Sequence, residues 1–140
     1  MNKQILKMCS MLVGLGLSAS VWAGNVVVIV NKDNNNAIDK HLVTKIYKGE
    51  AKLWESGGAI EALSLKQDNP ETEDFCKEIL GKRLIQMKLV WSQMMFSGQG
   101  VPPKELASDA DVKKAVSNNV NAIGFIKASD LDDTVKAVIK

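Results

Sequence analysis

The sequence predicts a single α/β domain, and three observations support this prediction. A continuous run of β-branched residues at 25–31 is typical of a strand buried on both faces. Asn69, Pro70 and Glu71 combine an N-cap residue, a proline at the first helical position and a first-turn acid, which together indicate a helix start. Because no repeat, low-complexity tract or linker divides the chain, these elements are expected to share one core.

Residues 1–23 have the layout of a secretory signal peptide. Lys3 and Lys7 precede an apolar run, and the segment ends in small residues with Val21 and Ala23 at the positions that a signal peptidase reads. The apolar run is interrupted by Gly and Ser and is shorter than the roughly 20 residues of a membrane-spanning helix. We therefore expect export to the periplasm with cleavage after Ala23, which leaves residues 24–140 as the mature domain.

The net charge of the mature domain differs from that of the whole chain. The whole sequence has 18 Lys plus Arg and 16 Asp plus Glu, and both surplus charges lie within residues 1–23. The mature domain is therefore neutral and lacks the basic excess that binding to nucleic acid or an anionic membrane needs. Any site for an anion must be local.

The first elements of the mature domain follow from local signals. After the buried strand and a polar loop, Asp39 is expected to cap a helix that reaches Tyr47 and that Gly49 ends. A Gly-rich turn then leads into a second strand over residues 59–65.

Two further helices and a loop are expected next. The helix that starts at Pro70 should end at Gly81, and another is expected over residues 84–95. Residues 96–103 contain two Gly and two Pro and predict a loop with special backbone angles. The inward stripe expected on the helix at 84–95 consists of Leu84, Met87, Val90, Trp91, Met94 and Met95.

The last third of the chain predicts one helix and two strands. Ser108 is expected to cap a helix, with Asp111 in the capping-box position. Strands are expected over residues 122–126 and 134–139, joined by an acidic turn at 130–133.

No catalytic residue, metal ligand set or cofactor motif can be assigned. His41 is the only histidine and is expected to be solvated on a helix face. Cys76 has no partner in the mature chain and is interpreted as a buried, inert thiol. The acidic residues at 68–74 sit across a helix start, where they complement the helix dipole rather than form a calcium loop. We therefore expect a protein that is not an enzyme.

Two polar loops are the candidate binding segments. Lys66 and Asn69 precede a helix N-terminus, where backbone N–H groups can hold an oxyanion without net basic charge. The second loop consists of Ser97, Gly98, Gln99 and Gly100.

These segments, taken in order, resemble those of a known family. The succession of motifs is similar to that of small exported proteins related to the phosphate-binding component of ABC phosphate transporters. The resemblance implies one lobe of a type 2 periplasmic-binding-protein fold, with a mostly parallel sheet flanked by helices. The motifs that support the resemblance are Val27–Asn31, Leu42–Ile46, Tyr47–Glu50, Trp54, Gly57–Ile60, Phe75, Ile79–Gly81, Trp91, Phe96–Gly100, Pro102–Pro103 and Asn121–Ile126.

The resemblance also implies a phosphate site. The family's phosphate loop, an Arg followed by Ser-Gly-Thr at a helix start, corresponds to Lys66 and to residues 69–71. Lys66 lacks the bidentate fork of Arg, Pro70 removes a backbone donor, and Glu71 places a negative charge where the family has a hydroxyl. The loop at 97–100 resembles its counterpart in the family, which implies that it supplies backbone N–H donors. The expected ligand-binding residues are Lys66, Asn69, Ser97, Gly98, Gln99 and Gly100.

Two functional hypotheses follow. The first is an exported, non-enzymatic solute-binding-like protein that recognises phosphate or a related oxyanion and is linked to phosphate ABC transport. The alternative is a ligand-free interaction module of the same fold in a sensor or envelope complex. Because the mature domain is about the size of one lobe, a second copy or another protein, such as a membrane transporter or a sensor, would be needed to complete the site.

Overall fold

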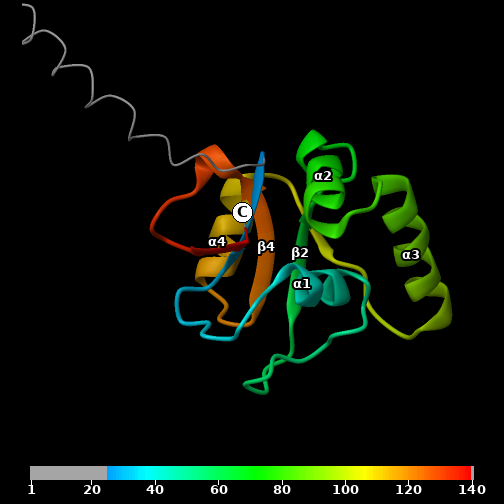
Figure 1. Cartoon of the computed structure of the whole chain (residues 1–140), viewed down its shortest axis with the longest axis horizontal. Coiled ribbons are helices and arrows are strands. Elements are labelled where there is room, and N and C mark those ends of the chain that lie inside the picture. The colour runs from blue at the N-terminus through cyan, green and yellow to red at the C-terminus, as the bar shows by residue number, and fades with distance from the viewer. Residues whose placement is uncertain (1–24, 140) are drawn as a thin grey trace, which may run out of the picture.

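The structure is a computed structural model that describes residues 25–139, so the expected signal peptide and its cleavage site lie outside the described residues. The chain forms a five-stranded sheet flanked by helices (Figure 1). The strands are β1 (Val26–Val30), β2 (Glu61–Leu65), β3 (Lys104–Leu106), β4 (Ala122–Lys127) and β5 (Lys136–Ile139). The helices are α1 (Lys40–Tyr47), α2 (Pro70–Phe75), α3 (Leu84–Ser97) and α4 (Asp109–Ser117), with a π-helical turn η2 (Cys76–Leu80) and a 3-10 turn η3 (Ala128–Asp130).

The sheet has the order β3-β2-β4-β1-β5 and confirms the predicted α/β fold class. Strand β2 is parallel to both β3 and β4, whereas β1 is antiparallel to both β4 and β5. Four strands therefore run in one direction and β1 alone runs in the other. The parallel pairs need crossover connections, which α2, η2, α3 and α4 supply.

Strand β1 is fully buried, as its sequence predicts, and lies inside the sheet, although the middle strand of the five is β4. All five of its residues are buried, and it lies between β4 and β5 with Val26 opposite Lys127 and Val30 opposite Ile123. A strand covered on both faces accounts for a run of β-branched residues without polar alternation.

The helices cover both faces of the sheet, as two adjacent residues of β4 show. Successive side chains of a strand point to opposite faces. A Cβ atom on Gly124 would lie 2.8 Å from the Val112 side chain of α4, while the Phe125 ring stacks on Phe75 of α2 with their centroids 4.0 Å apart. Helix α4 therefore packs on one face and α2 on the other.

An aromatic cluster forms the centre of the core on the α2 face. The Tyr47 ring meets Phe75 edge to face at 4.7 Å, and the Tyr47 hydroxyl donates a hydrogen bond of 2.7 Å to the Leu63 carbonyl of β2. The Trp91 indole N–H donates to the Tyr47 carbonyl at 2.9 Å. These bonds join α1, β2 and α3 through groups that would otherwise be buried without partners.

The predicted helix starts are confirmed by their capping bonds. The side chain of Asp39 accepts a hydrogen bond from the Leu42 amide at 2.8 Å, that of Asn69 from the Glu71 amide at 2.9 Å, and that of Ser108 from the Asp111 amide at 3.2 Å. Gly81 ends the helical segment in the left-handed conformation with φ of 67°, as expected.

The third helix differs from its prediction. Helix α3 continues to Ser97, and Gly98 ends it with φ of 66°. The prediction that Met95 points inward is wrong, because its side chain is 70% exposed while Leu84, Met87, Trp91 and Met94 are buried. Strand β3 was not expected, since its three residues are too few and too polar to produce a periodic pattern.

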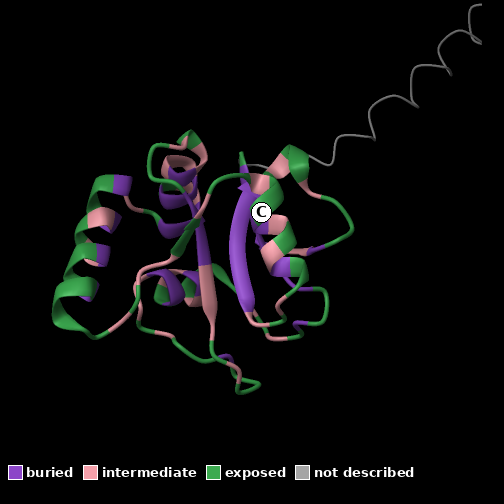
Figure 2. Cartoon of the chain, turned by 180° about the vertical axis from the view of Figure 1, so that it is seen from behind, coloured by how far each residue is buried: buried purple, intermediate pink, exposed green. Residues whose placement is uncertain are grey.

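Helix α3 lies at the periphery, at the side of the molecule away from α4, and its outer surface is exposed along much of its length (Figures 1 and 2). None of the helices within residues 25–139 has the length and apolar character that crossing a membrane requires.

Candidate functional site

The carboxyl ends of β2, β3 and β4 meet at one edge of the sheet because the three strands are parallel. The chain leaves β2 into the start of α2 at Pro70 and leaves β3 into the start of α4 at Asp109, so two helix N-termini face this edge. In open α/β sheets, ligands bind outside the carboxyl ends of the strands. The predicted residues Lys66 and Asn69 lie at this edge.

The start of α2 uses its own side chains to satisfy its backbone. Besides capping the Glu71 amide, Asn69 accepts a backbone bond of 3.0 Å from the Thr72 amide at its carbonyl. The Thr72 hydroxyl donates to the Lys66 carbonyl at 2.7 Å. The donors that an oxyanion would need at this helix start are thus already engaged.

Two carboxyl groups lie between the two helix starts. Oε2 of Glu71 and Oδ1 of Asp109 are buried and receive no hydrogen bond within the described part of the chain. The other oxygens are partnered: Glu71 Oε1 is 3.5 Å from the Lys127 ammonium, and Asp109 Oδ2 accepts from the Lys127 amide at 3.2 Å. Burial, together with the neighbouring Glu71, raises the pKa of Asp109 above its ordinary value. Phosphate at this edge would meet two carboxylates.

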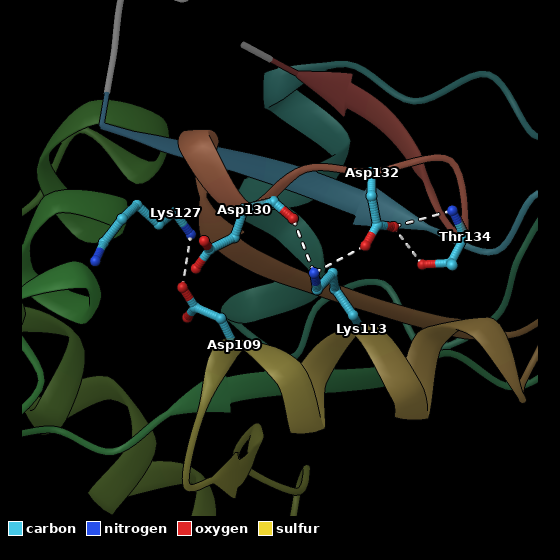
Figure 3. Close-up of polar contacts among 6 residues, drawn as sticks. All are labelled: Asp109, Lys113, Lys127, Asp130, Asp132 and Thr134. Carbon is cyan, nitrogen blue, oxygen red and sulfur yellow. Dashed lines mark hydrogen bonds and ion pairs between the residues drawn. The ribbon is translucent and has the colours of Figure 1, made fainter.

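The acidic cluster continues from Asp109 along the outside of α4 (Figure 3). The pKa of Asp130 is raised, chiefly by its contact with Asp109. Farther along, the Lys113 ammonium donates to the Asp130 carbonyl and to the Asp132 carboxylate, each at 2.9 Å. Bonds from Thr134 and Lys113 lower the pKa of Asp132. The carboxylates of the cluster therefore differ in hydrogen bonding: Asp132 accepts bonds from Lys113 and Thr134, whereas one oxygen of Asp109 accepts none within the described part of the chain.

The second predicted loop lies at the opposite end of β2. Lys66 follows the carboxyl end of β2, whereas the cavity next to the loop at 97–100 includes Ile60 and Glu61 at the amino end. A five-residue strand spans roughly 15 Å at about 3.3 Å per residue. The structure therefore does not bring Lys66 and Asn69 together with residues 97–100, and their roles as ligand-binding residues stay a prediction.

The cavity at the amino end of β2 is open and has a volume of about 820 Å³. Gly98, Gln99 and Gly100 form part of its wall, while Ser97 lines an adjoining hollow of about 710 Å³. The Lys52 ammonium donates to the Gln99 carbonyl and so fixes the loop against the segment before β2. The cavity is lined by Ile46, Gly49, Ala51, Lys52, Ile60, Glu61, Ala62, Gly98, Gln99, Gly100, Val101, Pro102 and Lys104.

The charges of this cavity favour an anion slightly. Lys52 and Lys104 face one acid, Glu61, whose carboxylate accepts a bond from the Asn119 amide group. Neither lysine forms an ion pair with a described residue. The Gly100 amide has no acceptor among the described residues either, so one backbone donor is available beside the two cations. The sequence did not indicate Lys52 or Lys104 as binding residues, because neither belongs to a motif.

The glycines of the loop have reasons of their own. Gly98 is required by its positive φ, and a Cβ atom on Gly100 would lie 3.0 Å from the Met94 methyl group. Met94 also fills the space beside Gly49. The Gly-rich sequence thus follows from the end of α3 and the packing of Met94, independently of any ligand.

His41 and Cys76 lie where the sequence predicts. His41 is exposed. Cys76 is buried and unpaired, and burial together with the nearby Glu73 raises its pKa to about 12, which keeps the thiol protonated and unreactive. Within residues 25–139, no three His, Cys, Asp or Glu side chains are placed to hold a metal ion together.

The fold is an α/β unit with helix starts at the carboxyl ends of parallel strands. Comparison with solved structures shows that substrate-binding receptors of phosphate transporters share this fold. An ABC-type phosphate transport receptor from Vibrio cholerae superposes with a TM-score of 0.64 at 19% identity, over 82% of this chain and 45% of that one.

Two further solved structures give the same result. A protein assigned as a phosphate ABC transporter substrate-binding protein from Clostridium perfringens, solved with bound phosphate, gives a TM-score of 0.63 at 23% identity over 82% of this chain and 44% of that one. PstS from Borrelia burgdorferi gives 0.60 at 12% identity over 83% and 47%. The chain thus spans less than half the length of the structures that it matches. No protein-family model and no curated protein matches its sequence.

Proposed function

We propose that the protein is an exported, non-enzymatic solute-binding-like protein that recognises phosphate or a related oxyanion. The fold shared with phosphate receptors supports this role. A link to phosphate ABC transport, through a membrane transporter or a sensor, forms part of the same proposal.

The observation that carries the proposal is the cavity at the amino end of β2. It combines Lys52 and Lys104, neither of which forms an ion pair with a described residue, with the loop of Gly98, Gln99 and Gly100. The carboxyl edge is the poorer candidate, because a carboxylate near a phosphate costs on the order of 1 kcal/mol even in water. We therefore place the oxyanion beside Lys104 and the Gly100 amide.

The proposed binding is weak. An open cavity leaves one side of the ligand in water, where charge interactions are screened. A dissociation constant on the order of 1 mM, equal to about 4 kcal/mol, is the expected range.

Calorimetric titration with phosphate, sulfate and small carboxylates tests the proposal, and two lysine variants locate the site. Lys104→Gln removes a cation at the amino end of β2, and Lys66→Gln removes one at the carboxyl end. We expect at least about a fivefold loss of phosphate affinity in Lys104→Gln, equal to about 1 kcal/mol, and no change in Lys66→Gln. The reverse result would move the site to the carboxyl edge, and no heat at millimolar ligand would refute oxyanion binding.

Export is tested separately. Expression of the full chain in a bacterium with a periplasm, followed by mass measurement of the periplasmic fraction, should give a product that begins at Gly24. Full-length protein in the cytoplasm would contradict this part of the proposal.

A specific observation favours the second candidate, a ligand-free interaction module. Glu71 and Asp109 place their carboxyl groups at the edge where sheets of this kind bind ligands. The discriminating experiment is Glu71→Thr combined with Asp109→Asn. Phosphate binding that appears in the double variant and is absent from the parent would favour the interaction module.

A further inference from the structure

The outer surface of α3 is apolar and has no partner within the described residues. Ile85, Leu89 and Phe96 are 66%, 61% and 93% exposed. Spacings of four and seven residues place the three side chains in one row along the helix. We call this row, completed by the exposed Ser92 between Leu89 and Phe96, the outer face of α3.

The opposite surface of α3 is apolar as well. Leu84, Met87, Trp91 and Met94 pack inward, where Trp91 bonds to the end of α1. A helix that is hydrophobic on both sides is typical of one that is covered on both sides. Figure 2 shows the buried inner turns and the exposed outer surface of α3, with nothing covering the latter.

The charges of α3 show what could cover this face. Arg83 and Lys88 lie at or near its N-terminal half, no acid occupies its first turn, and no cation occupies its last turn. A helix dipole is positive at the N-terminus and negative at the C-terminus. Glu73 Oε2 accepts from the Leu84 amide at 3.2 Å and so complements the N-terminal end, whereas the C-terminal end has no cation in its last turn. An antiparallel α3 helix would bring its cations beside the uncompensated C-terminal end, and each helix would do so for the other.

We propose that the outer face of α3 is a homodimer interface in which a second copy of this chain packs its α3 antiparallel to the first. A two-fold axis at the centre of the row places Ile85 opposite the partner's Phe96 and Leu89 opposite the partner's Ser92. The large apolar side chains at the two ends of the row then meet each other, and the small Ser92 leaves room for a leucine. The face is therefore complementary to itself, as a two-fold interface requires.

The proposal is independent of oxyanion binding, because the α3 residues that line the hollow, Val90, Gln93, Met94 and Ser97, do not belong to the outer face.

The size of the face sets the expected strength. A 14-residue helix is about 21 Å long, and its outer surface is smaller than the roughly 800 Å² per partner of a standard stable interface. The dimer should therefore dissociate in the range of about 10 µM to 1 mM.

Sedimentation equilibrium of the purified protein over this concentration range tests the proposal. The parent should show a reversible monomer–dimer equilibrium, and Leu89→Gln should weaken it at least about tenfold, since one buried leucine contributes about 1.5–3 kcal/mol. Val120→Gln is the matched control: Val120 is also an exposed apolar residue, at 46%, but lies outside α3. A parent that stays monomeric, or equal losses in both variants, would overturn the proposal.

A charge variant separates association from folding. Lys88→Glu should leave the free energy of unfolding nearly unchanged, because residue 88 lies beyond the first turn of α3, and should weaken the dimer, because a carboxylate would then lie beside the C-terminal half of the partner helix. Sedimentation should therefore change while unfolding does not. A dimer as strong as that of the parent would contradict the antiparallel arrangement.

Disulfide trapping tests the direction of the pairing. Oxidation of the double variant Ile85→Cys/Phe96→Cys should yield a covalent dimer, while Ile85→Cys alone should yield little, because two copies of residue 85 lie at opposite ends of the interface. Cys76 is buried and does not compete. Faster cross-linking of Ile85→Cys alone would indicate a parallel pair, and co-sedimentation with phosphatidylglycerol vesicles that removes the dimer would indicate a membrane surface; either result would refute the proposal.

Discussion

The two ends of strand β2 differ in the charge of the side chains beside them. At its carboxyl end, the helix start is capped by Asn69, and the carboxyl groups of Glu71 and Asp109 lie where a ligand would bind. At its amino end, Lys52 and Lys104 line an open cavity with the glycine loop. The comparison shows that the topology of a sheet can create an edge where ligands usually bind, while acidic residues at that edge make it unsuitable for an anion.

The largest effect is expected at the core that both ends share. Phe75 is fully buried between Tyr47 and Phe125, beside β2. Phe75→Ala should lower the free energy of unfolding by about 3–5 kcal/mol, because it removes buried surface and leaves a cavity. Urea denaturation measures this loss, and Phe96→Ala, at a side chain that is 93% exposed, should change stability by less than about 0.5 kcal/mol.

The next effect is expected at the amino end alone. Gly98 has φ of 66°, so Gly98→Ala should cost about 1–2 kcal/mol of stability and disturb the cavity loop. Gly81→Ala is the matched control, since Gly81 has φ of 67° and equally open space around it. Both variants should lose similar stability in urea, and only Gly98→Ala should lose phosphate affinity in a calorimetric titration. An equal loss of affinity in both would remove the loop from the site.

A smaller effect is expected at the carboxyl end alone. Asn69→Ala removes the N-cap of α2 and should lower the unfolding free energy by about 1 kcal/mol. Ser108→Ala does the same at α4 and serves as the control. If the two ends differ as we propose, phosphate affinity stays unchanged in both variants; a loss confined to Asn69→Ala would show that the ligand binds at the carboxyl edge.

The smallest effect has the opposite sign. The pKa of Asp109 is raised in the folded protein, so its ionised form opposes folding as the pH rises through that pKa. Asp109→Asn should therefore stabilise the protein at pH 7, by less than about 1 kcal/mol because the group is partly exposed and screened. The gain should disappear below about pH 4, where the unfolded carboxyl is protonated too.

Thermal unfolding between about pH 3.5 and pH 8 measures this difference. Asp111→Asn, in the same first turn of α4, should give no gain at neutral pH, because it removes an exposed acid that suits the helix dipole. A gain in Asp111→Asn equal to that in Asp109→Asn would show that general charge reduction, rather than the position of Asp109, is responsible.

The sequence was sufficient where a local signal determines the structure. The caps at Asp39, Asn69 and Ser108, the buried strand β1 and the α/β class were all predicted from short patterns. The end of α3 at Ser97 and the exposed position of Met95 were not predicted, because a helix that is apolar on both sides gives no clear periodic signal.

The candidate site was harder to predict because its parts come from distant segments. Asp109 lies beside Glu71 only through the parallel pairing of β2 with β3, although both follow a recognisable cap in the sequence. Conversely, the loops of Asn69 and Gly98 both have sequences suited to anion binding, yet they lie near opposite ends of β2. Composition contains no information on such distances.

The position of β1 has a consequence for how the chain folds. Val26 pairs with Lys127, about 100 residues later, and β1 is also paired with β5. Both neighbours of β1 in the sheet come from residues 122–139, so β1 stays unpaired until these residues have been synthesised, and contacts of such long sequence separation slow folding. The first strand of the domain is therefore among the last to be paired.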